Sequence, residues 1–215
     1  MKKLSTILLI SMLGIQLVNA QTNVKYINAM QKGMALLEKS RTSVDFNEAA
    51  NQFTRISSVE KTNWLPKYYS AYTTLLAGIF EEENEAKDLL FTKALALTEE
   101  ADVLSPNNSE VHTLKGYVQF MTMTVDPTTR AATAIPLAMA SLGKARKIDP
   151  TNPRPDFVQG QNTFYTPEYF GGGPTIAKPL LSSAAEKYEK QAVATDSFAP
   201  QWGKDRCLML LKECK

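Results

Sequence analysis

Histidine and cysteine are nearly absent from this chain of 215 residues. The only histidine is His112, and the only cysteines are Cys207 and Cys214. Zinc and iron sites need several such ligands at regular spacing. A histidine-based triad also needs a nucleophile motif, and no serine of this sequence lies in one. We therefore expect no metal, no cofactor and no catalysis, and keep an enzyme of unknown class only as a second alternative.

Long hydrophobic runs are also missing, except near the start of the chain. There Lys2 and Lys3 precede an apolar stretch, residues 4–17, and small residues follow up to Ala20. This order is typical of a secretory signal peptide cleaved after Ala20, and the stretch is too short and interrupted for a membrane span. No cysteine follows Ala20, so we expect no lipid anchor. The sequence predicts a periplasmic or secreted protein with no membrane anchor after cleavage.

Neither sign of charge is in clear excess. The full chain has 24 basic and 22 acidic residues, and the surplus disappears when Lys2 and Lys3 are removed with the signal peptide. A balanced chain without a basic cluster gives no electrostatic reason to expect a nucleic-acid partner. The rest of the chain is long enough for one core and contains no linker-like stretch. We expect a signal peptide over 1–20 and one domain over 21–215.

The two cysteines leave a disulfide open. In an unbroken helix, Cys207 and Cys214 would share a face but lie ~10.5 Å apart along the axis, beyond the ~7 Å limit for a disulfide. Export to an oxidising compartment favours pairing, whereas this spacing favours free thiols. Both outcomes remain open from the sequence.

A repeated phrase is the most informative feature that is present. Residues 101–108 and 145–152 each begin with alanine and end in a Pro-x-Asn or Pro-Asn turn, and Pro106 and Pro150 lie 44 positions apart. Proline ends a helix because it lacks an N–H and restricts the residue before it. Each phrase therefore predicts the end of one helix and the turn into the next.

Apolar periodicity supports helices throughout the mature chain, and no segment alternates with period two for long enough to predict a sheet. The expected helices are joined as antiparallel hairpins, which makes the fold all-α. They cover roughly 23–39, 45–56, 64–80, 86–104, 109–123, 134–148, 155–164 and 174–194, with a loop over 165–173 and a closing helix from Ala199.

Small and large residues in these hairpins match those of the tetratricopeptide repeat. The clearest set contains Gly116 in a first helix and Ala138, Leu142, Ala145 and Pro150 after it. Similar sets are Ala94, Thr98, Ala101 and Pro106, and Ala49, Phe53 and Ile56. The chain thus resembles a divergent exported member of that family. The resemblance implies hairpins stacked as a right-handed α-α superhelix, although the interval of 44 exceeds the family's usual ~34 residues.

The last third carries a second resemblance. Its short motifs are Asn152-Pro-Arg154, Gly160, Phe170-Gly-Gly-Gly173 and Pro200-Gln-Trp202-Gly203. They are similar to motifs of periplasmic repeat proteins associated with bacterial solute transporters. This resemblance implies a role in handling a small solute.

Candidate binding residues are aromatic or amide side chains. Those in first helices, which line the concave face in the family that the chain resembles, are Tyr68, Tyr72, Tyr117 and Phe120. Gln159 and Asn162 could orient a ligand, and Tyr165 and Phe170 lie in a Pro/Gly-bounded loop where bulky rings need a neighbour or a ligand. Core packing is the competing interpretation for the helical aromatics.

These observations lead to a non-catalytic, exported repeat scaffold. We expect it to bind a protein or peptide partner in its concave groove by burying apolar and aromatic surface. The alternative is a periplasmic small-solute-binding accessory of a transporter. An enclosed cavity would favour the solute, and an open groove would favour the peptide or protein.

Overall fold

Helices are the only regular secondary structure in the described part of the chain. The computed structural model describes residues 24–191 and 196–214, and all regular secondary structure in these ranges is helical. The expectation of an all-α fold is therefore confirmed for this part of the chain. The signal peptide expected over 1–20 lies outside the described residues. None of the described helices is long and apolar enough to cross a membrane.

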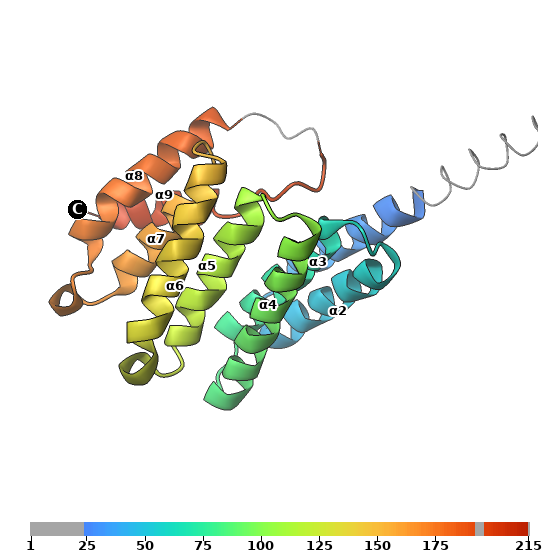
Figure 1. Ribbon diagram of the computed structural model, residues 1–215, viewed down its shortest axis with the longest axis horizontal. Helices are drawn as coiled ribbons and strands as arrows, with labels where there is room; N and C mark the ends of the chain where they lie inside the picture. Colours follow the sequence, from blue (N-terminus) through green and yellow to red (C-terminus); the bar gives the residue numbers. More distant parts are fainter. Residues whose placement is uncertain (1–23, 192–195, 215) are drawn as a thin grey trace, which may run out of the picture.

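The helices lie side by side in chain order, from α2 at one end to α8 at the other (Figure 1). A first helix covers residues 24–39. It is followed by α2 (Ser43–Val59), α3 (Trp64–Ile79), α4 (Asn84–Leu104), α5 (Ser109–Met123), α6 (Pro127–Ile148), α7 (Arg154–Tyr165), a short 3-10 turn (Glu168–Phe170), α8 (Pro174–Lys190) and α9 (Lys204–Glu213).

Alternate helices of the chain also pack against one another. From α2 to α9, each α-helix contacts the next one along the chain. In addition, α3 contacts α5, α5 contacts α7, and α7 contacts α9. These four helices therefore form one continuous row, which we call the inner row. The inner row positions the candidate site described below.

The two repeated phrases form the expected helix boundaries. Asn108 precedes α5, and its Oδ1 accepts a hydrogen bond of 2.9 Å from the backbone N–H of Glu110. Asn152 does the same at the start of α7, where its Oδ1 accepts from the N–H of Arg154 at 2.9 Å. The amide of Asn152 also donates to Ser109 Oγ at 3.0 Å. Each asparagine thus satisfies backbone donors at a helix start, and the second one ties α7 to α5.

Two helices begin elsewhere than the sequence predicts. Helix α6 begins at Pro127, seven positions before 134, because Asp126 caps it by accepting from the N–H of Thr129 at 3.2 Å. Its 22 residues account for much of the long repeat interval. Helix α9 begins at Lys204 and not near Ala199, because the residues before it form a non-helical segment bound across the inner row.

The same close contact occurs in every hairpin. A glycine in the first helix faces a large apolar side chain of the second, so closely that an added Cβ would lie under 3.0 Å from it. Only glycine allows this approach without a shift of the neighbouring side chain. The pairs, with the distance from the built Cβ, are Gly33–Phe53 (2.6 Å), Gly78–Phe91 (2.5 Å), Gly116–Leu142 (2.8 Å) and Gly160–Leu181 (2.9 Å).

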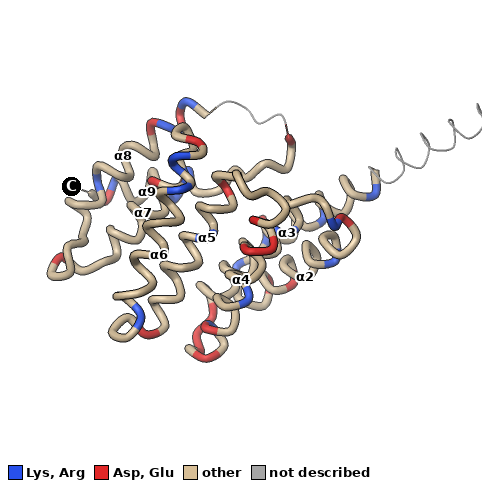
Figure 2. The backbone as a smooth tube through the Cα atoms, in the orientation of Figure 1, with Lys and Arg blue, Asp and Glu red and all other residues tan. Residues whose placement is uncertain are grey.

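Charged residues of both signs are spread over the molecule, and an acidic run marks the turn between α3 and α4 (Figure 2). Glu81 in this turn accepts a hydrogen bond from Ser43 Oγ at 2.8 Å, and Glu85 lies in the first turn of α4. Carboxylates are favourable at a helix N-terminus. No cluster of potential metal ligands occurs among the described residues. The acidic run therefore has a structural explanation.

Both cysteines are free thiols in the structure and both are buried. Cys207 donates a weak hydrogen bond to the carbonyl oxygen of Leu181, with a distance of 3.4 Å. Burial raises the pKa of the Cys207 thiol to about 11. The disulfide that the sequence left open is not formed here, in agreement with the expected helical spacing.

Replacing Ala138 by leucine should destabilise the fold. Ala138 is 0% exposed in α6, where the hairpin with α5 leaves no room for a branched side chain. Overpacking of this kind typically costs ~1–3 kcal/mol. The matched control is Ala140→Leu, since Ala140 is exposed on the same helix. Urea unfolding measures the stability of both variants. Equal midpoints would show that the α5–α6 contact has room for a leucine at position 138.

Candidate ligand cavity

The inner row contains a cavity of about 550 Å³. Its walls come from α3, α5 and α7, and from the chain at the start of α9. Most of its lining is aromatic or aliphatic. The lining residues are Tyr72, Leu76, Ile79, Phe80, Tyr117, Met121, Phe157, Gln161, Tyr165, Trp202, Gly203 and Arg206.

Helical geometry explains why these residues meet. Residues four positions apart lie on the same face of a helix. In α7, the lining residues Phe157, Gln161 and Tyr165 have this spacing, and in α5 Tyr117 and Met121 have it. In α3, α5 and α7, the residues on one face of the helix therefore line the cavity.

Trp202 forms the part of the cavity wall that contacts the aromatic residues of these helix faces. Its ring stacks on Tyr72 with a centroid distance of 5.0 Å and an interplanar angle of 18°. The ring of Tyr117 lies 6.0 Å away at 27°, and Phe157 meets Trp202 edge-on at 6.2 Å. The indole Nε1 donates a hydrogen bond of 2.7 Å to the hydroxyl of Tyr68. This wall thus offers flat apolar surface with its polar atom already satisfied.

Few polar side chains line the cavity. The cationic residue among them is Arg206, which lies at the exposed edge. Arg206 is exposed, and its guanidinium lies 5.6 Å from the ring centroid of Tyr165 and contacts the Tyr165 hydroxyl. Deeper inside, Gln161 Nε2 donates to the Tyr117 hydroxyl at 2.8 Å. The cavity thus combines an apolar interior with one positive charge at its edge.

Two of the lining tyrosines are held in the neutral form. Burial raises the pKa of Tyr72 well above its usual range, and nearby tyrosines add to this effect. Burial also raises the pKa of Tyr117, although the hydrogen bond from Gln161 opposes it. Desolvation disfavours a phenolate. These rings can stack and hydrogen-bond, but they do not supply negative charge at neutral pH.

Three residues chosen from the sequence lie in the cavity wall. They are Tyr72, Tyr117 and Tyr165. Tyr68 lies behind the wall, fully buried and bonded to Trp202. Phe120 is 1% exposed in the core and does not line the cavity. Core packing is therefore the role that the structure gives to Phe120, whereas Tyr68 supports the wall from behind.

The other three lie away from the cavity. Gln159 Oε1 accepts from Arg146 at 2.6 Å, on a different face of α7. Asn162 is not among the lining residues either. Phe170 is 73% exposed and contacts its exposed neighbour Tyr169, with ring centroids 5.1 Å apart. The loop over 165–173 thus contributes Tyr165 alone to the cavity.

Sequence reasoning missed most of the apolar wall and the cationic residue. Leu76, Phe157 and Gln161 could have been found by counting four positions from Tyr72 or Tyr165 along their helices. Trp202 and Arg206 give no such signal, because the non-helical segment that contains Trp202 also places Arg206, in the first turns of α9, at the cavity.

Acid should weaken the ion cluster around Asp156, which includes Arg146, the hydrogen-bond partner of Gln159. Asp156 accepts hydrogen bonds from Arg146 (2.6 Å), Lys187 (2.7 Å) and Ser183 (2.8 Å). Burial raises the pKa of Asp156, but these bonds outweigh burial and lower the pKa overall. The stabilisation is present above the unfolded carboxyl pKa of ~3.9 and is lost as pH falls through the lower folded value.

We therefore expect Asp156→Asn to lower the free energy of unfolding at pH 7 by ~2 kcal/mol, the size of a hydrogen bond to a charged group. The difference from the unchanged protein should shrink below about pH 4. Urea unfolding at pH 7 and pH 3 measures it. Asp205→Asn on the exposed side of α9 is the control. A difference that is the same at both pH values would contradict the assignment.

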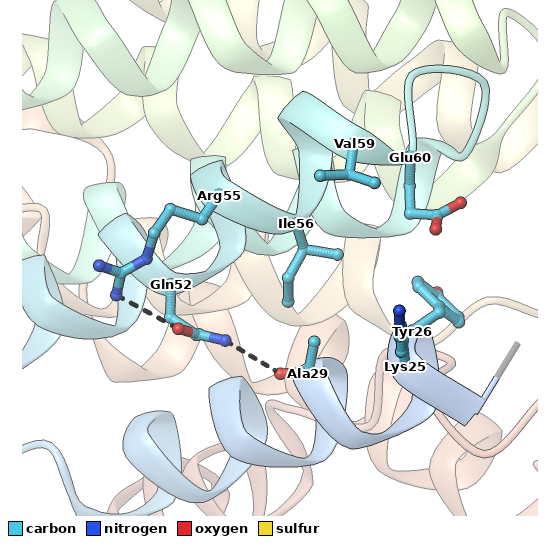
Figure 3. A pocket seen from close by; sticks show the side chains of 8 residues that line it. All are labelled: Lys25, Tyr26, Ala29, Gln52, Arg55, Ile56, Val59 and Glu60. Carbon is cyan, nitrogen blue, oxygen red and sulfur yellow. Dashed lines mark hydrogen bonds between the residues drawn. The ribbon is translucent and has the colours of Figure 1, made fainter. Parts of the chain in front are cut away.

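A smaller cavity of about 380 Å³ lies between the first helix and α2 (Figure 3). In its wall, Gln52 donates to the carbonyl oxygen of Ala29 at 3.3 Å and accepts from Arg55 at 3.2 Å. Gln52 thus joins the two helices. This cavity shares no residue with the inner-row cavity and contains none of the candidate binding residues chosen from the sequence.

The described part of the chain is a helical scaffold with an aromatic cavity along its inner row. Among solved structures, the chain is similar to the HusA haemophore from Porphyromonas gingivalis. The TM-score is 0.77 and the sequence identity is 29%, over 88% of this chain and 92% of that chain. No protein-family model matches the chain, and no curated protein matches it. The likeness is compatible with a non-catalytic binding role.

Proposed function

We propose that this protein is a non-catalytic carrier that binds a planar, anionic tetrapyrrole of the haem class in the inner-row cavity. The observation that carries the proposal is the cavity itself, in which stacked aromatic rings face an apolar interior and Arg206 lies at the edge. A flat apolar ring matches the interior, and its carboxylates match the guanidinium.

The cavity has a suitable size and preorganisation for such a ligand. Its volume of about 550 Å³ falls within the ~300–1,000 Å³ typical of small-molecule sites. Phe157 is 2% exposed and Tyr117 8% exposed, so the inner wall is packed before a ligand arrives. The likeness to a haemophore, a word that denotes a haem carrier, adds the ligand class.

The ligand's ring, and not its metal, is the part that the cavity would recognise. Neither histidine nor cysteine is among the lining residues. The single histidine, His112, is 3% exposed, and its Nε2 lies 3.0 Å from the carbonyl oxygen of Pro106. Tyr72 and Tyr117 stay neutral because burial raises the pKa of each. Met121 and Tyr165 are the other possible donors in the wall, and the Tyr165 hydroxyl already contacts Arg206 at the exposed edge. We therefore expect tetrapyrroles with and without iron to bind with similar affinity.

The proposal extends to the architecture and the location of the protein. The glycine contact repeated in four hairpins supports a tetratricopeptide-like superhelix, with the inner row on its concave side. The signal-like start of the sequence supports export to the periplasm or beyond. An exported carrier with a cavity fits the small-solute alternative from the sequence better than a peptide groove.

Titration of residues 21–215 with haemin and with metal-free protoporphyrin tests the proposal. We expect saturable binding of both, seen as a changed porphyrin absorption band and quenched tryptophan fluorescence. Arg206→Gln should weaken binding about fivefold to tenfold, because one charge-assisted contact is lost. Lys204→Gln, a change of charge on the same helix at a residue that does not line the cavity, is the control. Absence of saturable binding by either porphyrin would refute the proposal.

A protein partner remains the second candidate because of one surface feature. Tyr169 is 91% exposed and Phe170 73% exposed, side by side on the loop between α7 and α8. Exposed aromatic pairs of this kind are typical of protein contacts. Loss of a partner's binding on Tyr169→Ala with Phe170→Ala, with porphyrin binding absent in the unchanged protein, would favour this candidate.

A further inference from the structure

The segment before α9 is held across the inner row by its carbonyl groups. We call residues 198–202 the strap. Tyr69 Oη donates to the carbonyl oxygen of Phe198 at 2.8 Å. Arg154 Nη2 donates to that of Pro200, and Tyr188 Oη to that of Trp202 at 3.0 Å. Three helices thus bind alternate carbonyl groups of the strap, and the last of these belongs to the cavity-wall residue.

Arg154 is the central and most unusual of the three donors. It is 0% exposed, which is rare for a charged side chain. Its Nη1 donates to Glu110 Oε1 at 3.0 Å, and its Cζ lies 5.5 Å from the Trp202 ring centroid. One side chain therefore bonds the strap two residues before Trp202 and also contacts the Trp202 ring.

The wall residue has little freedom once these contacts form. Gly203, which follows Trp202, has φ of 102°, a conformation that favours glycine. A Cβ there would lie 2.3 Å from Tyr188 Oη. The backbone next to the strap is thus packed tightly, and the Trp202 indole is held by its hydrogen bond to Tyr68.

We infer that Arg154 is a positioning residue for ligand binding, which holds the strap so that Trp202 forms the cavity wall. Arg154 does not line the cavity. It acts through the Pro200 carbonyl oxygen and the Trp202 ring. The inference rests on the proposed function for its effect on affinity, whereas the placement of Trp202 can be measured without any ligand.

Arg154→Lys provides the test, because lysine keeps a charge for Glu110 but lacks the planar fork that reaches two acceptors. The chain has two tryptophans, so a Trp64→Phe background leaves Trp202 as the only fluorophore of its kind. Without ligand, we expect Arg154→Lys to shift Trp202 emission to longer wavelength and to increase its quenching by acrylamide. Porphyrin affinity should fall about threefold to tenfold, the equivalent of one aromatic contact.

Arg146→Lys is the matched control. Arg146 bonds Asp156 and not the strap, so its replacement should leave Trp202 emission unchanged. If Arg154→Lys does not fold, Tyr188→Phe decides, because it removes a strap bond without touching a charge and should shift Trp202 in the same direction. Unchanged emission and quenching in a folded Arg154→Lys protein would overturn the inference.

The two proposals fail in different ways. If the unchanged protein binds no porphyrin, the proposed function fails, but the emission and quenching measurements still decide the placement of Trp202. If Trp202 moves in Arg154→Lys and the porphyrin affinity does not change, the role of Arg154 in binding is refuted while the proposed function stands.

Discussion

Arg154→Ala should lower the free energy of unfolding by ~3–5 kcal/mol, because removing one partner of a buried pair leaves the other charge uncompensated. The Oε2 atom of Glu110 is already buried without a hydrogen-bond partner among the described residues. The Arg154 guanidinium is the cation that balances this carboxylate. Loss of the guanidinium also removes the donor to the Pro200 carbonyl oxygen. Urea unfolding at pH 7 measures the loss.

The control for this variant is a surface pair. Lys67 and Glu100 form an ion pair of 2.5 Å in which the glutamate side chain is 57% exposed. Lys67→Ala should lower the unfolding free energy by only ~0–1 kcal/mol. A loss for Arg154→Ala as small as that for Lys67→Ala would show that Glu110 is well solvated.

The loss at Arg154 should also depend on pH. Burial raises the pKa of Glu110, and Arg154 opposes this effect in the unchanged protein. In Arg154→Ala the opposition is gone, so the folded pKa rises further above the unfolded value of ~4.3. The Glu110 carboxyl contributes no penalty below its unfolded pKa, where it is protonated in both states, and its contribution grows as pH rises. The variant should therefore lose less stability at pH 5 than at pH 8.

Much of the fold could be predicted because helices and their ends depend on local sequence. Asn108 and Asn152 indicate helix starts because their side chains can accept hydrogen bonds from backbone N–H groups, and both hydrogen bonds are present. Helix α9 could not be placed in the same way. Pro200 and Trp202 are compatible with a helix start, but their carbonyl groups are bound by Arg154 and Tyr188, which are distant in sequence. A contact of that range leaves no local pattern.

The site was predictable only in part for the same reason. Tyr72 and Tyr117 are recognisable as aromatic residues in first helices, and they line the cavity. Gln159 and Asn162 were chosen by residue type, yet the amide that reaches the cavity is Gln161. Helix rotation of ~100° per residue separates these neighbours. The choice required knowing which face of α7 turns inward, and Phe157 and Tyr165 indicate that face only when the i, i+4 spacing is followed.

Replacing the two stacking tyrosines should have the largest effect on binding. Tyr72→Leu with Tyr117→Leu keeps apolar volume in the wall but removes the rings that stack with Trp202. Both rings line the cavity, so each would also contact a bound porphyrin. Aromatic pairs add ~0.5–1.5 kcal/mol each beyond buried area, so loss of the two ring–porphyrin contacts should lower porphyrin affinity roughly tenfold to a hundredfold. Titration of this double variant against the unchanged protein measures the loss, with thermal unfolding as a check that the fold is retained.

Tyr169→Ala with Phe170→Ala is the matched control, because it also removes two aromatic rings, but from a loop outside the cavity. Porphyrin affinity should stay within about twofold of the unchanged protein, since these rings are exposed and touch none of the stacked wall. Their exposure also means that thermal stability should change little. If instead the loop variant loses affinity and the Tyr72 and Tyr117 variant keeps it, the ligand binds at the exposed loop and the inner-row cavity is not the site.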